Sequence, residues 1–443
     1  MTEPWFAELA ELIRIPSVSA DCDRVGDVRA AGQWIDDFLR RAGASSELVD
    51  WDGQPLVVAH MAASRDAGEA PTVLCYGHFD VQGVEPLELW ESDPFELATR
   101  GEWTYARGIA DDKGGLYMLM KAAAELAADG ELPVNLRFLF DGEEETLGDS
   151  VVEYIAADPE PADACVIFDM SMAARDVPAF SIGTRGNVIG HVRVRAGSSD
   201  LHSGAYGGAA MNAVHVLHAL LAAVLPRDGV LPAALRVGIV ASDARELDDL
   251  ARLEQGADVL AGVGSRPADA LAAEQYHHRV RFEPTVEVTG ILGGSPDVQK
   301  TIVPATASAR ISMRIAAGQD PEAIRDAAER LLREAAPAGA ELELTWSSTT
   351  PAALFPTSAP AIQLGCEAFE RALGTRPLLL RAGGTLPIMG ALAAKGIDTV
   401  LTGFALSESR VHAPNERLLT HYVPLGIATA KELFRTYARL PRR

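Results

Sequence analysis

The sequence predicts an α/β protein: a domain with a mixed, mainly parallel sheet flanked by helices, into which a smaller α+β domain with an antiparallel sheet is inserted. Three observations support this prediction. Short apolar runs alternate with helical patterns over about the first 170 residues, strands with alternating apolar and polar residues follow residue 186, and the first pattern resumes near residue 359. Parallel strands buried on both faces are continuously apolar, whereas strands of a half-covered sheet alternate.

The predicted strands of the first domain lead into polar side chains. Apolar runs predict buried strands at residues 73–76, 136–140, 166–168 and 399–401. Helical patterns lie before and between the first three, at residues 5–14, 116–127 and 151–156. Ligands of such sheets bind outside the carboxyl ends of the strands. Because the first three runs continue directly into histidine or carboxylate side chains, we expect a binding site at this edge.

The inserted domain is predicted to span residues 187–358, so that the first domain comprises residues 1–186 and 359–443. Alternation predicts half-buried strands at residues 188–195 and 307–315. Helical patterns accompany them at residues 213–224 and after Asp320-Pro321, where the proline opens a helix. A chain of 443 residues also exceeds the size of one ordinary hydrophobic core.

Composition and charge exclude some classes of partner. The formal net charge is −23, and so acidic a surface repels the phosphates of nucleic acids. No apolar run approaches the roughly 20 residues that a membrane helix needs, and the N-terminal residues show no signal-peptide pattern. The four cysteines are scattered, as expected for reduced thiols. We therefore expect a cytoplasmic protein that binds neither nucleic acid nor membranes.

His78 and Asp80 follow the first predicted strand of the sheet. Residues two apart on an extended segment face the same side, so Asp80 can hold the second ring nitrogen of His78. Such a contact orients many histidine ligands of zinc. Taken alone, this pattern is a weak indicator of a metal site.

Two acidic motifs allow two interpretations each. Asp111-Asp112, followed by two glycines at the start of a predicted helix, is either an acidic N-cap or a carboxylate that bridges two cations, for which the glycines leave room. The carboxylates of residues 141–145 form either a solvated acidic turn or a cation site. In a cation site, one of two adjacent glutamates can bind the cation while the next acts as general base for a metal-bound water.

Asp169 and His412 complete the candidate set. Asp169 ends a buried apolar run, where an unpaired carboxylate is costly, and His412 lies late in the chain. Two histidines and three carboxylates without thiolates suit Zn²⁺, with Mn²⁺ as the alternative. Two such ions about 3.5–4 Å apart can together activate water and polarise a carbonyl.

Several motifs together resemble those of a known family. They are GHFDVQ (77–82), ARGIADDKGG (106–115), DGEEE (141–145), DLHSGAYGG (200–208), KTIVP (300–304) and AGGTLP (382–387). The sequence resembles the co-catalytic di-zinc peptidases and amidohydrolases, which include aminoacylase, glutamate carboxypeptidase and the deacylases of arginine and lysine biosynthesis. The motifs are most similar to those of the branch with cytosolic non-specific dipeptidase and carnosinase. The resemblance extends from about residue 12 to residue 416.

The resemblance implies a role for each metal-site residue. The implied ligands are His78 and Asp169 for one ion, Glu145 and His412 for the other, and Asp111 for both. Glu144 is implied as the base that takes a proton from a water bridging the ions. Asp80 would hold the second ring nitrogen of His78. The peptide bond between Asp111 and Asp112 is implied to be cis.

The resemblance also implies how the substrate is bound. His202 would reach into the site of a partner subunit and stabilise the oxyanion there. Thr301 and Arg314 would bind the substrate's C-terminal carboxylate, to which an Arg side chain is suited by its fork of donors. The backbone amides of Gly383 and Gly384 would bind the same carboxylate. Thr385 stands where the most similar dipeptidases have serine, which leaves the preferred substrate open.

These implications predict a metal-dependent dipeptidase that hydrolyses short peptides with a free C-terminal carboxylate. It would bind two divalent metal ions per subunit, Zn²⁺ or else Mn²⁺, and form a homodimer through residues 187–358. Two alternatives stay open at this point. One is an N-acyl-amino-acid deacylase of the same family, and the other is a metal-free relative that acts as a binding protein.

Overall fold

The computed structural model describes residues 4–51, 53–146, 148–295 and 297–442. The chain forms two compact units, which are described separately. The first comprises Met1–Ile182, Phe355–Leu380 and Pro387–Arg443, and the second comprises Gly183–Leu354 and Arg381–Leu386. The predicted boundaries, 186/187 and 358/359, each lie four residues after those of the compact units. Residues 381–386 group with the second unit because their backbone bonds to Gly183 and Arg185.

The first unit is built on a mixed sheet. Its strands follow the order β1 (Ser45–Val49), β2 (Leu56–Met61), β6 (Asn135–Asp141), β3 (Thr72–His78), β7 (Ala164–Ile167), β17 (Thr399–Leu401) and β8 (Ala179–Thr184), with β16 (Leu378–Arg381) also paired to β8. The four central strands β6, β3, β7 and β17 are parallel, whereas β1 and β2 pair antiparallel with their neighbours and β8 pairs antiparallel with β17. The predicted α/β architecture is thereby confirmed.

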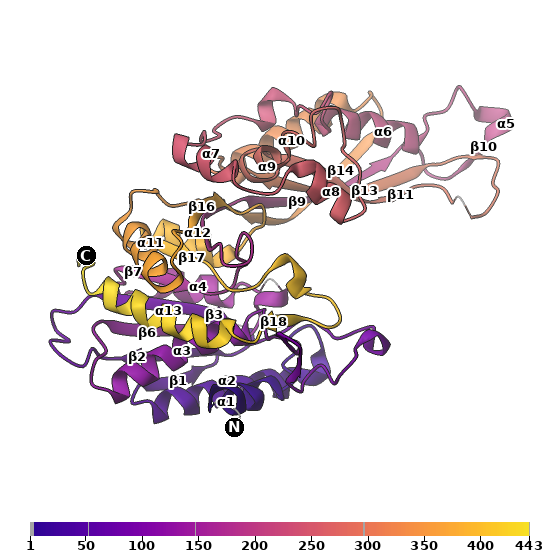
Figure 1. Ribbon diagram of the computed structural model, residues 1–443. Helices are drawn as coiled ribbons and strands as arrows, with labels where there is room; N and C mark the ends of the chain where they lie inside the picture. The colour runs from indigo at the N-terminus through magenta and orange to yellow at the C-terminus, as the bar shows by residue number, and fades with distance from the viewer. Residues whose placement is uncertain (1–3, 52, 147, 296, 443) are drawn as a thin grey trace. The chain divides into compact units, whose positions relative to one another are not determined.

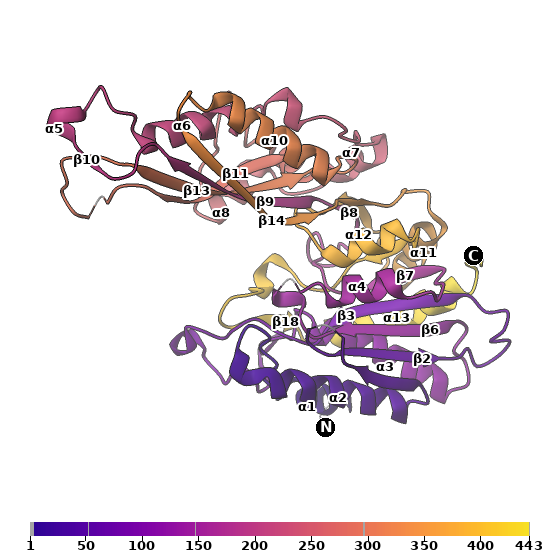
Figure 2. The ribbon, with the colours of Figure 1, turned by 180° about the vertical axis from the view of Figure 1, so that it is seen from behind.

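Helices flank this sheet (Figure 1; Figure 2). They are α1 (Pro4–Ile13), α2 (Val25–Arg41), α3 (Lys113–Ala128), α4 (Ser150–Ala157), α11 (Pro360–Leu373), α12 (Pro387–Ala394) and α13 (Tyr422–Tyr437). The glycines that begin α3 are required by close packing, since a Cβ atom at Gly114 would lie 2.1 Å from the carbonyl oxygen of Ile109. The predicted helices at 5–14, 116–127 and 151–156 correspond to α1, α3 and α4.

The second unit has an antiparallel sheet with the order β11 (Thr285–Leu292), β13 (Thr306–Ile315), β9 (Gly186–Arg195) and β14 (Glu341–Thr350). Helices α6 (Ala213–Val224) and α10 (Pro321–Ala335) begin at the capping side chains of Asn212 and Asp320. They share a core with the apolar face of the sheet, including Val192 and Ile311. Three short helices follow α6, namely α7 (Ala244–Leu250), α8 (Gly256–Gly262) and α9 (Tyr276–Phe282).

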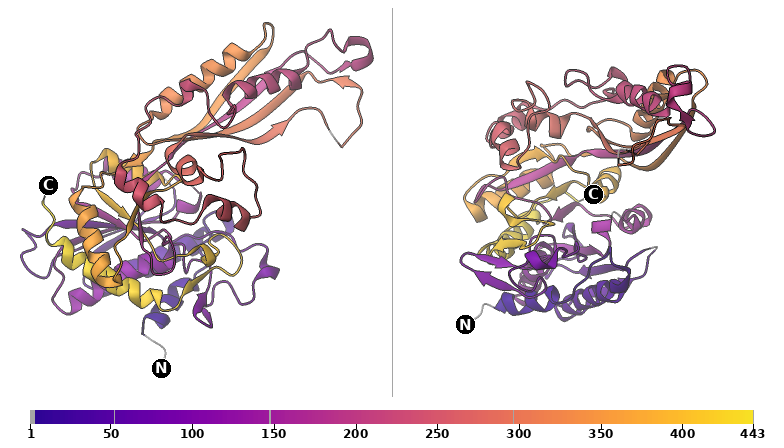
Figure 3. Two further views of the ribbon diagram at one scale, coloured as in Figure 1. Left: turned by 45° about the horizontal axis from the view of Figure 1, so that its top comes forward. Right: turned by 90° about the vertical axis from the view of Figure 1, so that its right-hand side faces the viewer.

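A two-stranded arm extends from one end of this sheet (Figure 3). It consists of β10 (Leu201–His202) and β12 (Ile302–Val303), and the single-turn helix α5 (Ser203–Tyr206) follows β10. Across the described residues, every helix is too short or too polar to span a lipid bilayer.

Candidate metal centre and catalytic site

The carboxyl ends of the parallel strands carry the candidate metal ligands. His78 is the last residue of β3, and Asp169 lies two residues beyond β7. Glu144 and Glu145 form a short turn after β6, whose last residue Asp141 pairs with His78. Because β6, β3 and β7 run parallel and adjacent, their ends deliver these side chains to one edge of the sheet.

The candidate ligands form two groups that share Asp111. One group is His78, Asp111 and Asp169, the other is Asp111, Glu145 and His412, and within each the ligand atoms lie within 4.8 Å of one another. Asp111 Oδ1 is 2.9 Å from His78 Nε2, and Asp111 Oδ2 is 2.8 Å from His412 Nε2. The two oxygens of one carboxylate therefore face different histidines, which is the arrangement that a bridging ligand needs. The peptide bond after Asp111 is cis.

The carboxylates of the site repel one another. Burial, together with the charge of Asp111, raises the pKa of Asp169 to about 7. Burial likewise raises the pKa of Glu144 to about 8, and the charges of Asp169 and Glu145 add to the effect. Burial also raises the pKa of Asp111, but hydrogen bonds from the two histidines outweigh it and hold that pKa below the usual range.

This donor set fits a pair of divalent cations. Five nitrogen and oxygen side chains converge without a thiolate, and a cation between them would offset the repulsion between the carboxylates. Among the residues that the structure describes, the buried Oε1 atom of Glu145 has no hydrogen-bond partner, as expected of an oxygen placed to bind an ion.

For the metal-free protein we expect the free energy of unfolding to fall as the pH rises from about 5 to about 7. Asp141, Asp169 and Glu144 have folded-state pKa values of about 7, 7 and 8, above the ordinary values of 3.8 and 4.5. Between those limits the folded state binds more protons than the unfolded state, so stability is lost with rising pH. Urea unfolding of chelator-treated protein measures the slope.

The metal-loaded protein is the control for this pH dependence. Its ligands must be deprotonated, so metal binding, and with it stability, increases over the same pH interval. Lys113, whose pKa burial lowers to about 7, acts in the opposite direction to the acids but only above pH 7. If the metal-free protein gained stability between pH 5 and pH 7, the raised folded-state pKa values of these buried carboxyl groups would be contradicted.

Asp80 lies behind His78, but its carboxylate is not the nearest acceptor. His78 Nδ1 is 3.1 Å from the carbonyl oxygen of Asp80 and 3.4 Å from its Oδ1 atom. Asp80 Oδ2 instead accepts hydrogen bonds from Ser19 Oγ (2.6 Å) and from the backbone N–H of Glu145 (3.1 Å). Asp80 thus contacts residues of both ligand groups. Gln82, to which the sequence pattern assigned no role, donates to Glu145 Oε2 at 2.9 Å.

Glu416 is a further residue that sequence reasoning missed. Its fully buried carboxylate accepts hydrogen bonds from the backbone N–H groups of Gly108, Ala110 and Asp111 and pairs with Arg107 at 2.5 Å. It therefore fixes the turn before Asp111 to the segment that carries His412. No local pattern marks such a contact, because more than 300 residues separate the partners.

Replacing Glu416 is expected to destabilise the protein strongly. Glu416→Gln would leave the buried guanidinium of Arg107 without its counter-charge, which costs about 3–5 kcal/mol of unfolding free energy. Asp50→Asn is the matched control, because it removes one partner of an exposed pair with Arg29 and should cost less than about 1 kcal/mol. Chemical denaturation of both variants measures the difference; equal losses would refute this role of Glu416.

Four of the predicted substrate-binding residues meet in the second unit. Arg314 Nη1 donates to Thr385 Oγ1 at 2.5 Å, and Thr385 Oγ1 donates to the carbonyl oxygen of Arg185 at 2.7 Å. The preceding Gly383 and Gly384 accept hydrogen bonds from the side chain and the backbone N–H of Arg185, respectively. Arg185 is a member of this cluster that the sequence prediction did not include.

Thr301 does not join that cluster within one chain. It lies beside His202 at the arm, where its carbonyl oxygen accepts the N–H of Ser203 at 2.9 Å. Arg314 is eight residues from Thr306 along β13, and a strand rises about 3.4 Å per residue, so roughly 27 Å separates the two ends. Thr301 and Arg314 of one chain are therefore too far apart to hold the same carboxylate, and their shared role stays a prediction.

Comparisons with known proteins match residues 74–436 to peptidase family M20/M25/M40. The cysteinylglycine-S-conjugate dipeptidase of Corynebacterium striatum is 28% identical over 99% of this chain and 96% of its own length. The Cys-Gly metallodipeptidase of Schizosaccharomyces pombe is 27% identical, covering 98% and 95%. An M20 family metallo-carboxypeptidase from Sulfolobus solfataricus has the same fold, with a TM-score of 0.85, 23% identity and coverage of 99% and 100%.

Proposed function

The chain belongs to peptidase family M20/M25/M40, and on this premise we propose that it is a metal-dependent dipeptidase for short peptides with a free C-terminal carboxylate. The observation that supports this most directly is Asp111, whose two oxygens face the two ligand groups. The relatives named as dipeptidases extend over nearly the full chain, which is consistent with the same reaction class.

The proposed ion ligands are His78 and Asp169 on one side, Glu145 and His412 on the other, and Asp111 between them. Imidazole and carboxylate ligands favour Zn²⁺, with Mn²⁺ as the alternative. Two bound cations would make water more acidic and polarise the scissile carbonyl. Asp80 and Glu416 act through other residues, Asp80 by contacting His78 and Glu145 and Glu416 by holding the backbone of Asp111.

We assign the general base to Glu144. It adjoins the proposed ligand Glu145 in the turn after β6, and burial raises its pKa because little solvent stabilises its charge. Cations bound nearby would lower that pKa toward a value suited to proton transfer at neutral pH. Glu144 would take a proton from the attacking water and return it to the leaving amine.

We further propose that the active form is a homodimer joined through residues 187–358. A dipeptide spans roughly 7 Å, so side chains at opposite ends of β13 cannot both contact it within one chain. The arm of a second copy would supply His202 to stabilise the oxyanion, together with Thr301. Arg314, Thr385 and the amides of Gly383 and Gly384 would hold the carboxylate in cis.

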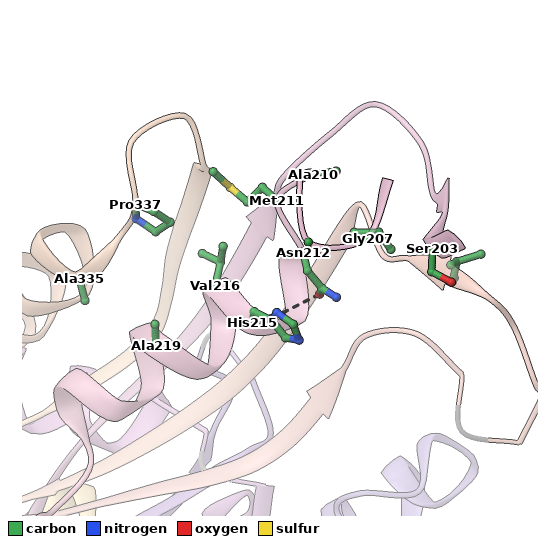
Figure 4. A pocket seen from close by; sticks show the side chains of 13 residues that line it. Ser203, Gly207, Ala210, Met211, Asn212, His215, Val216, Ala219, Ala335 and Pro337 are labelled. Carbon is green, nitrogen blue, oxygen red and sulfur yellow. Dashed lines mark hydrogen bonds between the residues drawn. The ribbon is translucent and has the colours of Figure 1, made fainter. Parts of the chain in front are cut away.

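A groove next to the arm supports this proposal (Figure 4). It has a volume of about 560 Å³ and is lined by α6 and by residues of the arm, including Met211, His215 and Ile302. Ile291 and Leu292, at the end of the edge strand β11, are 64% and 72% exposed. A second chain that paired along this edge of the sheet would cover them.

Mixed dimers are expected to show that His202 acts in trans. Glu144→Gln and His202→Ala chains, each inactive alone, would form heterodimers in which one of the two sites combines an intact Glu144 with an intact His202. Random assembly of equal amounts then restores about a quarter of the wild-type activity. No recovery, despite heterodimers shown by differential tags, would place His202 in its own chain's site, and a His202→Ala chain that is active alone would place His202 outside the chemistry.

A substrate panel with metal-reconstituted protein tests the proposed reaction. We expect Cys-Gly and other dipeptides to be hydrolysed and N-acetyl amino acids to be poor substrates. Cleavage of only N-acetyl amino acids would instead identify a deacylase, and no activity with either Zn²⁺ or Mn²⁺ would favour a binding protein. A cytoplasmic location is proposed because the four cysteines are free and three of them are buried.

A further inference from the structure

Residues 226–282, called the bracing segment below, have no role in the chemistry described so far. We propose that this segment holds the turn 382–385 in place and thereby sets the affinity for the substrate's C-terminal carboxylate. Arg381 and Glu246 would be the positioning residues. This inference rests on the proposed function, because the turn matters only if the substrate carries that carboxylate.

Arg381 connects the turn to the bracing segment. Its guanidinium binds Glu246 through two bonds, Nε to Oε1 at 2.6 Å and Nη2 to Oε2 at 3.0 Å, and each side chain is 3% exposed. The remaining donors reach the carbonyl oxygens of Val240 (2.9 Å) and Ala241 (3.0 Å). A bidentate, charge-assisted contact fixes direction as well as distance.

Glu246 is itself held in place at the start of α7. The side chain of Asp243 accepts the N–H of Glu246 at 2.8 Å, and Glu246 Oε2 accepts the N–H of Asp243 at 2.7 Å. This reciprocal capping box restrains both residues. Glu246 therefore presents its carboxylate to Arg381 from a fixed helix end rather than from a free loop.

The end of the bracing segment contacts the turn directly. Arg281 Nη1 donates to the carbonyl oxygen of Arg381 at 2.6 Å. A Cβ atom at Gly383 would lie 2.7 Å from the carbonyl oxygen of Val280, so the backbones nearly touch there. On its other side the turn is held by Arg185, whose Nε donates to Gly383 at 2.7 Å.

These contacts hold the turn between two supports. Arg185, which directly precedes β9, and Arg314 in β13 contact the turn from the sheet side, and the bracing segment contacts it through Glu246, Val280 and Arg281. The amides of Gly383 and Gly384 can bind an anion tightly only if their directions are fixed before the anion arrives. Loss of the contacts between the bracing segment and the turn should therefore weaken carboxylate binding and leave the metal centre intact.

The test compares a dipeptide with the same dipeptide carrying a C-terminal amide. For Glu246→Gln we expect the KM for the dipeptide to rise between about tenfold and 100-fold, while kcat, metal content and the low rate with the amide change little. The preference for the free carboxylate thus falls. Arg381→Lys, which keeps one bond to Glu246, should raise the KM for the dipeptide by a smaller factor. This variant replaces Glu246→Gln in the test if Glu246→Gln folds poorly.

Asp269→Asn is the matched control, because it removes an Arg–carboxylate pair of the bracing segment in which Arg279 bonds to Asp269 and Gln275 rather than to the turn. It should leave the preference unchanged. Equal losses for dipeptide and amide, or an unchanged preference in both Glu246→Gln and Arg381→Lys, would overturn the inference. A wild-type protein that cleaves dipeptides no better than their amides would instead refute the proposed function.

Discussion

Glu144→Gln is expected to lower kcat for dipeptide hydrolysis by about 10²- to 10⁴-fold while the protein keeps its metal ions. An amide of the same shape cannot accept the proton of the attacking water, and general-base catalysis is worth a factor of that order. The metal content should persist because Glu144 belongs to neither ligand group. Steady-state kinetics and elemental analysis of the same preparation measure the two quantities.

Glu143→Gln serves as the comparison within the same turn. The carboxylate of Glu143 accepts the backbone N–H groups of Gln54 and Ser150, so its loss should appear in the unfolding free energy. The kcat of folded Glu143→Gln should fall far less than that of Glu144→Gln. If Glu144→Gln retained more than about a tenth of the wild-type kcat, another group would have to be the base.

Asp111→Ala is expected to abolish activity and to remove both metal ions. Each ligand group loses an oxygen, since Oδ1 lies next to His78 and Oδ2 next to His412. The drop in kcat should exceed about 10³-fold, because bound divalent cations lower the pKa of water by many units. Equilibrium dialysis followed by elemental analysis gives the stoichiometry.

Asp169→Ala and His412→Ala are the matched single-group variants. Each removes one ligand from only one of the two groups, so each should still retain one ion per chain under the same dialysis. An Asp111→Ala protein that retained two ions would show that Asp111 bridges nothing. A His412→Ala protein that lost both ions would show instead that the two groups do not fill independently.

The meeting of the candidate metal ligands at one edge of the sheet could be predicted because most of them follow a local rule. His78, the 141–145 motif and Asp169 each stand at the end of an apolar run, and parallel strands bring such ends together. Asp111 and His412 lie outside that rule. The glycines after Asp111 left two interpretations open, and the resemblance to known enzymes supplied the specific roles of both residues. Asp80 showed the limit of spacing arguments, because its carbonyl rather than its carboxylate lies nearest His78.

The substrate half could not be assembled from the sequence. Thr301 and Arg314 are thirteen positions apart, yet most of β13 extends between them, so that Thr301 lies on the arm and Arg314 near the other end of the strand. Arg185 and Arg381 carry no motif of their own. Their partners come from segments up to about 200 residues away, so no window of sequence contains the contact.

By itself, the sequence determined the elements, the chemistry of the side chains and the edge of the sheet at which they gather. These depend on periodicity and on the order of residues along a strand, which are local properties. The folded chain sets which atoms meet: the two oxygens of Asp111 face different histidines, Glu416 accepts the backbone N–H of Asp111, and Glu246 pairs with Arg381. Such contacts depend on how distant segments pack, and packing distances of a few ångströms are set by the whole core at once.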